Sequence, residues 1–141
     1  METIFAENQI QERIRLLGQE ISRDYGQETI HAIGMLDGGF IFLADLVRKI
    51  SSPVSCHFLK MEMVDSGITL DHLVQQLALK NPKSLRTAAL VNREDRRRVA
   101  LPLSYVGFTW NGGHLVGYGL DQNGLFGNLP YLAAMSSISA H

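Results

Sequence analysis

The residues Asp65-Ser66-Gly67-Ile68-Thr69 form the stretch of this sequence best suited to chemistry. A strand-like run comes before them and a helical pattern follows, so successive backbone N–H groups would lie at a helix N-terminus. Such a turn, together with the Ser66 and Thr69 hydroxyls, suits a phosphomonoester dianion. Asp65 would place a carboxylate beside whatever the phosphate anchors. The competing interpretation is an ordinary helix whose first turn is capped by Ser or Thr.

A second turn of the same kind is Asp37-Gly38-Gly39, which follows the apolar run at residues 29–36 and precedes a helical pattern at residues 40–50. Two glycines allow the backbone to approach a ligand closely, although they also ease any tight turn. In open parallel sheets, ligands bind beyond the carboxyl ends of the strands. We therefore expect both turns to lie at the same edge of one sheet.

The elements that must position these turns alternate between strand-like and helical runs. Apolar residues at helical spacing predict an N-terminal helix through Ile10, Ile14, Leu17 and Ile21, and a later helix through Leu70, Leu73, Val74 and Leu77. This order favours an α/β fold with a mostly parallel, twisted sheet flanked by helices. The predicted strands are residues 29–36, 54–63, 85–91, 104–108 and 114–120.

Length and composition are those of one soluble globular domain, expected over residues 1–136, with a disordered tail at 137–141. The formal net charge is −1 and the basic run at residues 93–98 is broken by two acids, so we expect no nucleic-acid partner. No signal peptide or membrane-spanning run is evident, which predicts a cytoplasmic protein. The single cysteine, Cys56, lies in a strand-like run and is expected to be a buried, inert thiol.

Longer stretches of the chain resemble the hypoxanthine-guanine phosphoribosyltransferases. The resemblance implies a type I phosphoribosyltransferase-like fold, in which helices flank a parallel sheet and a small hood closes over the purine. Members of this family usually form dimers or tetramers, so the resemblance also implies a homo-oligomer. The matching stretches occur in the family's order and cover most of the chain: "GGFIFLADLVRKI", "DSGITLDHL", "REDRRRVALPLSYVGF", "LVGYGLD" and "NLPY".

The resemblance implies a reaction as well as a fold. A purine nitrogen attacks the anomeric carbon of phosphoribosyl pyrophosphate, and magnesium pyrophosphate leaves through an oxocarbenium-like transition state. Hypoxanthine would give IMP and guanine would give GMP, with Mg2+ as the cofactor. The family pattern does not separate the two bases, because both carry the 6-oxo group that is recognised.

Roles for individual residues follow from the same resemblance. Asp65 would take or share the proton of the purine ring, Arg93 would contact the 6-oxo group, and the backbone around Leu115 would contact the ring edge. His114 stands where the family has a stacking aromatic residue, and Asp121 would approach the 2-position of the base or a metal-bound water. Arg93 as a surface residue and Asp121 as a turn former are the competing interpretations. The predicted set is Asp65, Ser66, Gly67, Ile68 and Thr69 for the phosphate; Arg93, His114, Leu115 and Asp121 for the purine; Asp37, Gly38 and Gly39 for the pyrophosphate side; and Glu62 with Asp121 for the metal.

One segment of the family is absent between the run at residues 56–63 and the phosphate turn. In the family this segment forms a mobile flap and then the central strand that leads into the turn, with two adjacent acids near its end. Here Glu62 matches one acid and Met61 stands at the position of the other. Two explanations stay open: the run at residues 56–63 replaces the central strand, giving a sheet one or more strands short, or a flap segment has been removed from a longer chain.

Other departures lie on the pyrophosphate side. Asp37 stands where the family has a lysine, and an acid beside pyrophosphate is repulsive unless a metal intervenes. Gly127 stands where the family has an arginine, which removes a bidentate anion contact. Arg93 replaces the purine-contacting lysine and keeps the charge with a different reach. We therefore expect nucleotide binding to survive better than transfer, so an impaired purine phosphoribosyltransferase is the main prediction. A catalytically weak nucleotide-binding or regulatory homologue is the alternative, and an inactive shortened scaffold is a third.

Overall fold

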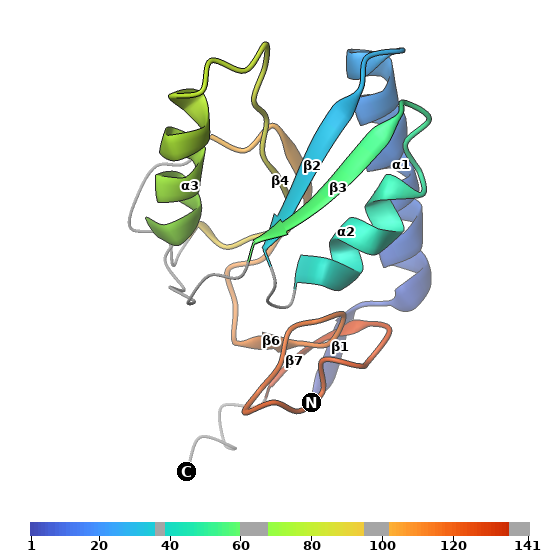
Figure 1. Cartoon of the computed structure of the whole chain (residues 1–141). Coiled ribbons are helices and arrows are strands. Elements are labelled where there is room, and N and C mark those ends of the chain that lie inside the picture. The colour runs from blue at the N-terminus through green and yellow to red at the C-terminus, as the bar shows by residue number, and fades with distance from the viewer. Residues whose placement is uncertain (36–38, 60–67, 95–101, 136–141) are drawn as a thin grey trace. The chain divides into compact units, whose positions relative to one another are not determined.

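The computed structural model describes residues 1–35, 39–59, 68–94 and 102–135 (Figure 1). Its contacts divide the chain into two compact units, one formed by residues 1–60 and 112–141 and the other by residues 61–111. A single domain over residues 1–136 stays a prediction, and the predicted tail lies outside the described residues. No helix in the described part of the chain is long and apolar enough to cross a membrane.

Helix α1 (Glu7–Tyr25) forms the core of the first unit. Ile10, Ile14 and Leu17 are fully buried, which confirms the amphipathic face predicted from their spacing. The helix begins where the backbone N–H of Ala6 donates to Gln9 Oε1 at 2.8 Å, and this bond satisfies one of the N–H groups at the helix start. It ends at Gly26, whose φ of 57° is one that glycine adopts easily.

A strand–helix–strand unit follows, made of β2 (Ile30–Met35), α2 (Gly39–Val47) and β3 (Val54–Leu59). The two strands are parallel and in register from the pair Ile30–Val54 to the pair Met35–Leu59. Helix α2 lies close to β2, because a Cβ added to Gly34 would stand 2.4 Å from Leu43 Cδ2. The predicted order of these three elements is confirmed, although the helix ends earlier than the sequence pattern suggested.

A small antiparallel sheet completes the first unit. Its strands are β1 (Glu2–Phe5), β6 (Leu115–Val116) and β7 (Leu132–Ala134), in the order β1-β7-β6. The sequence analysis missed β1 and β7, and its strand at residues 114–120 was too long. The backbone leaves the extended conformation at Gly117, Tyr118 and Gly119, whose φ angles are 101°, 49° and 96°.

The second unit contains helix α3 (Ile68–Ala78) and the parallel strands β4 (Ala88–Asn92) and β5 (Tyr105–Thr109). The strands approach closely at Gly107, where an added Cβ would stand 2.5 Å from the carbonyl oxygen of Leu90. The helix ends ahead of Asn81, whose φ is 53°, and the following proline prevents its continuation. Strand β4 begins three residues later than predicted.

The parallel strands of the described residues form two separate pairs, β2–β3 and β4–β5. The α/β class is confirmed, whereas the expected single sheet is seen only as these short pieces. Cys56 is exposed, so its prediction as a buried thiol was wrong. The reason is that β3 has β2 as its one partner in the described part of the chain, and a two-stranded ladder cannot bury all its side chains.

Candidate functional site

Residues 114–121, named the purine segment here, contain three of the predicted purine residues, and all three lie within the described ranges: His114, Leu115 and Asp121. Leu115 and Val116 form β6 and are almost completely buried, with 2% and 0% of their surfaces exposed. Beyond them the chain folds into a tight loop, in which Gly117 N–H donates to Leu120 O at 2.8 Å and Leu120 N–H donates back at 2.9 Å. Asp121 follows this loop and is exposed.

The two ends of the purine segment come together. His114 Nε2 lies 3.1 Å from the backbone carbonyl oxygen of Asp121. A carbonyl oxygen only accepts, so the proton of this contact belongs to His114 Nε2. The structure thus brings three of the predicted purine residues, His114, Leu115 and Asp121, into one closed loop.

Gly127 lies beside this loop. Its carbonyl oxygen accepts from the Gly119 N–H at 2.8 Å. A Cβ added to Gly127 would stand 3.8 Å from the Cβ of Asp121 and 3.5 Å from the Gly119 carbonyl oxygen, both ordinary contacts. The position where the family carries an arginine is therefore next to a predicted site residue, and it has room for a side chain.

Tyr118 is a residue of the same segment that sequence reasoning missed. It is 5% exposed, and its hydroxyl donates a hydrogen bond to Asp45 of helix α2. Burial, and then this bond, raise the pKa of Tyr118 well above the usual value for a phenol. A left-handed φ costs a side-chain-bearing residue about 1–2 kcal/mol, so the surrounding contacts must hold Tyr118 in place. The sequence did carry a signal, since Gly-Tyr-Gly is an unusual way to continue a strand.

Asp45 accepts from three parts of the first unit. Besides the Tyr118 hydroxyl, it accepts from Arg48, which directly follows α2, and, at 3.5 Å, from Gln11 Nε2 on α1. Only 19% of its side chain is exposed. Its signal in the sequence was a lone acid within the otherwise apolar stretch of α2.

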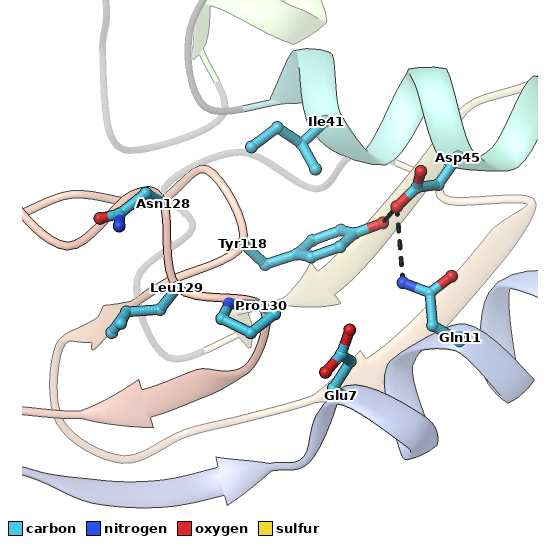
Figure 2. A pocket seen from close by; sticks show the side chains of 8 residues that line it. All are labelled: Glu7, Gln11, Ile41, Asp45, Tyr118, Asn128, Leu129 and Pro130. Atoms are coloured by element: carbon cyan, nitrogen blue, oxygen red, sulfur yellow. Dashed lines mark hydrogen bonds between the residues drawn. The ribbon is translucent and has the colours of Figure 1, made fainter.

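A hollow of about 330 Å³ lies next to this bond. Figure 2 shows Tyr118 reaching across it toward Asp45, with Gln11 approaching the same carboxylate from α1. No residue of the predicted site lines this hollow, so its walls carry no part of the predicted chemistry. The lining residues are Glu7, Gln11, Ile41, Asp45, Tyr118, Asn128, Leu129 and Pro130.

In the second unit, Arg93 comes directly after β4 and is half-buried. Its neighbour Asn92 is 8% exposed and donates through Nδ2 to Glu94 Oε1 at 3.3 Å. The other amide atom, Asn92 Oδ1, is buried and has no hydrogen-bond partner within the described ranges. Buried acceptors of this kind are rare and need an explanation. Asn92 is thus a second candidate that the sequence analysis missed.

The remaining predicted residues lie at or beyond the edges of the described ranges. Gly39 begins helix α2, and Ile68 and Thr69 begin helix α3, so each helix starts at its predicted turn. Among the described residues, no group of three or more His, Cys, Asp or Glu side chains could hold a metal ion. Six predicted residues lie outside the described ranges: Asp37, Gly38, Glu62, Asp65, Ser66 and Gly67.

No protein-family model matches the chain. A hypoxanthine-guanine phosphoribosyltransferase of Dictyostelium discoideum is 33% identical over 170 residues, which covers 95% of this chain and 94% of that protein. The chain belongs to the hypoxanthine-guanine phosphoribosyltransferase family. The alignment spans 170 positions whereas the chain has 141 residues, so this relative carries residues that have no counterpart here. The hypoxanthine phosphoribosyltransferase of Salmonella typhimurium is 29% identical, covering 94% of this chain and 93% of that protein.

Solved structures of the family share the fold. A hypoxanthine-guanine phosphoribosyltransferase of Bacillus anthracis superposes with a TM-score of 0.89 at 33% identity, covering 95% of this chain and 96% of that one. The hypoxanthine phosphoribosyltransferase of Trypanosoma cruzi, in complex with the product IMP, gives a TM-score of 0.90 at 25% identity, covering 98% and 91% of the two chains. These matches confirm the predicted type I phosphoribosyltransferase fold.

Proposed function

We propose that this protein is a purine phosphoribosyltransferase that transfers the phosphoribosyl group of phosphoribosyl pyrophosphate to hypoxanthine or guanine. Membership of the family supports the reaction, and a relative of known structure carries the product IMP. The observation that carries the proposal for this chain is the closed purine segment, in which His114 and Asp121 meet beside the buried strand of Leu115.

The geometry of β6 supports recognition of the base through the backbone. Strand β6 stands at the end of the order β1-β7-β6, so one of its edges has no neighbour among the described strands. Backbone N–H and C=O groups at such an edge can pair with the hydrogen-bonding edge of a purine. In this arrangement Leu115 would hold the ring edge and His114 would stack on the base. The role of Arg93, donation to the 6-oxo group, is proposed from the family resemblance alone.

The phosphate and the reacting proton are assigned to the turn ahead of α3. The N–H groups of residues 65–69 and the Ser66 and Thr69 hydroxyls would bind the 5′-phosphate, favoured by the positive end of the helix dipole. Asp65 would accept the proton of the purine nitrogen as the bond to the anomeric carbon forms. Asp37, Gly38 and Gly39 would line the pyrophosphate side.

Mg2+ is the proposed cofactor. The Asp121 carboxylate is exposed and beside Gly127, and oxygen atoms of this kind are the ligands that Mg2+ prefers. Glu62 would supply a second carboxylate. When bound, the ion would neutralise the charge of the leaving pyrophosphate, which matters more here because Asp37 adds a negative charge on that side.

Two further features belong to the same proposal. The protein would act as a cytoplasmic dimer or tetramer, like other members of its family. Helix α2 supports an interface, because it is strongly apolar and Phe40 at its start is 49% exposed. Light scattering on the purified protein tests the oligomeric state directly.

A nucleotide-binding homologue with weak turnover is the second candidate. Gly127 favours it, because the position beside Asp121 carries no cation for pyrophosphate. Asp37 favours it for the same electrostatic reason. Under this candidate the protein would bind IMP without Mg2+ more tightly than phosphoribosyl pyrophosphate with Mg2+, and an enzyme would show the opposite order.

The deciding experiment is IMP formation from hypoxanthine and phosphoribosyl pyrophosphate, with and without Mg2+, beside an Asp65→Asn control. The proposal predicts turnover that requires Mg2+ and falls about 100-fold or more in the control, since a positioned general base contributes 10²- to 10⁴-fold. No turnover in a folded sample that binds IMP would establish the nucleotide-binding alternative.

A further inference from the structure

We propose that Tyr118 and Asp45 are positioning residues, which fix the purine segment to helix α2 and so align the two substrates. The inference rests on the proposed function, because it assigns both residues to the same transfer reaction. Neither residue belongs to the predicted contact set. Tyr118 lies in the purine segment, and Asp45 lies on helix α2, which begins at Gly39 of that set.

The loop conformation around Tyr118 needs outside support. Tyr118 has a φ of 49° between two glycines that also have positive φ, and a bulky residue rarely stays there unless its surroundings hold it. Its N–H donates to Leu129 O at 2.7 Å, and the Gly119 N–H donates to Gly127 O. These backbone bonds fix the loop against residues 127–129. Within the described ranges, the bond from the Tyr118 hydroxyl to Asp45 joins the loop to helix α2.

Asp45 connects the purine segment with the helix that follows the predicted pyrophosphate turn. It lies on helix α2, which begins at Gly39 of the predicted pyrophosphate turn. Its carboxylate also accepts from Gln11 (Figure 2). A further bond comes from Arg48, so the position of Asp45 is fixed from three directions. The hydrogen-bonded backbone of a helix keeps its residues at a fixed spacing. The Tyr118–Asp45 bond therefore also sets the distance between the purine segment and the start of helix α2.

This arrangement has a kinetic signature. Transfer requires the purine nitrogen and the anomeric carbon to meet in line, and a misplacement of about 1 Å can cost 100-fold in rate. Each substrate alone binds through its own contacts. Loss of the Tyr118–Asp45 bond should therefore lower kcat much more than it changes either KM.

The test is Tyr118→Phe, which keeps the buried ring and removes only the hydroxyl. We expect kcat per folded molecule to fall about tenfold and both KM values to stay within about threefold. The melting temperature should fall by a few degrees at most, because one buried hydrogen bond is lost. The matched control is Tyr131→Phe, which removes a hydroxyl ahead of β7 and leaves the Asp45 bond intact; its kcat should not change. A merely structural role would lower the active fraction and leave kcat per folded molecule unchanged.

Two substitutions of Asp45 test whether an oxygen that accepts from Tyr118 is enough to keep kcat. Asp45→Asn keeps an oxygen that can accept from Tyr118, so it should retain most of the wild-type kcat. Asp45→Ala should match the loss in Tyr118→Phe, and the double variant should lose no more than the worse single one, because both act through one bond. Additive losses in the double variant would overturn the inference.

The outcomes separate this inference from the function on which it rests. A wild-type protein that neither forms nor binds IMP contradicts the proposed function, and the inference fails with it. An active wild type whose Tyr118→Phe variant keeps its kcat overturns the inference alone. A wild type that binds IMP without turnover also overturns the inference, because an alignment of two substrates then serves no transfer.

Discussion

Helices α1 and α3 carry similar amphipathic patterns, yet they are buried to very different extents. Ile10, Ile14 and Leu17 of α1 are fully buried. In α3 the corresponding residues Leu73, Val74 and Leu77 are only partly covered. An amphipathic pattern therefore predicts that a helix forms, whereas the depth of its burial depends on what the rest of the fold places against it.

The cause lies in the neighbours that each helix has within its own unit. Helix α1 packs so closely on the segment after α2 that a Cβ added to Gly18 would stand 2.4 Å from the carbonyl oxygen of Lys49. The unit of α3 has two described strands, β4 and β5, and such a pair offers little apolar surface. The purine segment thus belongs to the well-packed unit and the predicted phosphate turn to the sparsely packed one.

The largest expected change in the free energy of unfolding comes from removing core packing in α1. Ile14→Ala should lower the free energy of unfolding by about 3 kcal/mol, because it deletes fully buried methyl groups. Leu77→Ala in α3 should cost roughly 1 kcal/mol or less, since its side chain stays partly in water. Urea denaturation of both variants measures the difference. Equal losses would remove the contrast between the two helices.

The next effect concerns the left-handed loop. Gly117→Ala should destabilise the protein by roughly 2 kcal/mol. Its Cβ would collide with the carbonyl oxygen of Tyr131 at 1.9 Å, and its φ of 101° disfavours a side chain. Gly124→Ala is the matched control, because it has a positive φ but open space around the Cβ; it should cost about 1 kcal/mol. Similar melting temperatures for the two variants would show that the close approach does not matter.

The raised pKa of Tyr118 predicts a loss of stability in alkali. Burial and the bond to Asp45 favour the neutral phenol in the folded state, so the pKa of Tyr118 is higher folded than unfolded. Stability from this group is fully present below about pH 10 and declines as pH rises above it, by at most about 1.4 kcal/mol per pH unit. Tyr118→Phe should lack this part of the decline in melting curves taken between pH 9 and about pH 11. If Tyr118→Phe and the wild type lose melting temperature equally between these pH values, the prediction is wrong.

The smallest effect is expected at Asn92. Asn92→Leu removes a buried acceptor that lacks a partner among the described residues. It should stabilise the protein by less than about 1 kcal/mol, because the Nδ2 bond to Glu94 is lost as well. If the amide oxygen faces a ligand, the same variant should bind IMP more weakly while melting at a higher temperature. Higher stability with unchanged IMP affinity would show that Asn92 lies away from the site.

Sequence reasoning succeeded where one local pattern decides the structure. The spacing of Ile10, Ile14 and Leu17 predicted α1, and the glycine and Ser-Gly turns marked where α2 and α3 begin. It failed for the three-residue strand β7 and for β1, because strands this short carry no clear alternation. The pattern also gave no warning that Cys56 is exposed, since burial depends on partners of β3 that are distant in the sequence.

For the candidate site, the sequence named His114, Leu115 and Asp121 but not the residues that hold them. Tyr118 and Asp45 are far apart in the chain, and only the fold brings them together. The family resemblance identifies residues that contact a ligand, whereas hydrogen bonds between distant elements have to be seen in three dimensions. This is why the sequence predicted the residues that would contact a ligand but not Tyr118 and Asp45, which hold the segment in place.

Hydrogen–deuterium exchange with and without IMP tests the central claim most directly, because it locates the nucleotide whether or not turnover occurs. The proposal predicts slower exchange in three segments: the phosphate turn at residues 64–70, the end of β4 around Arg93, and the purine segment at residues 114–121. Residues around Glu7 and Pro130, which line the hollow next to the Tyr118–Asp45 bond, should not change. No slowing in the three segments at saturating IMP, or slowing confined to residues around Glu7 and Pro130, would contradict the assignment of this chain as a purine phosphoribosyltransferase.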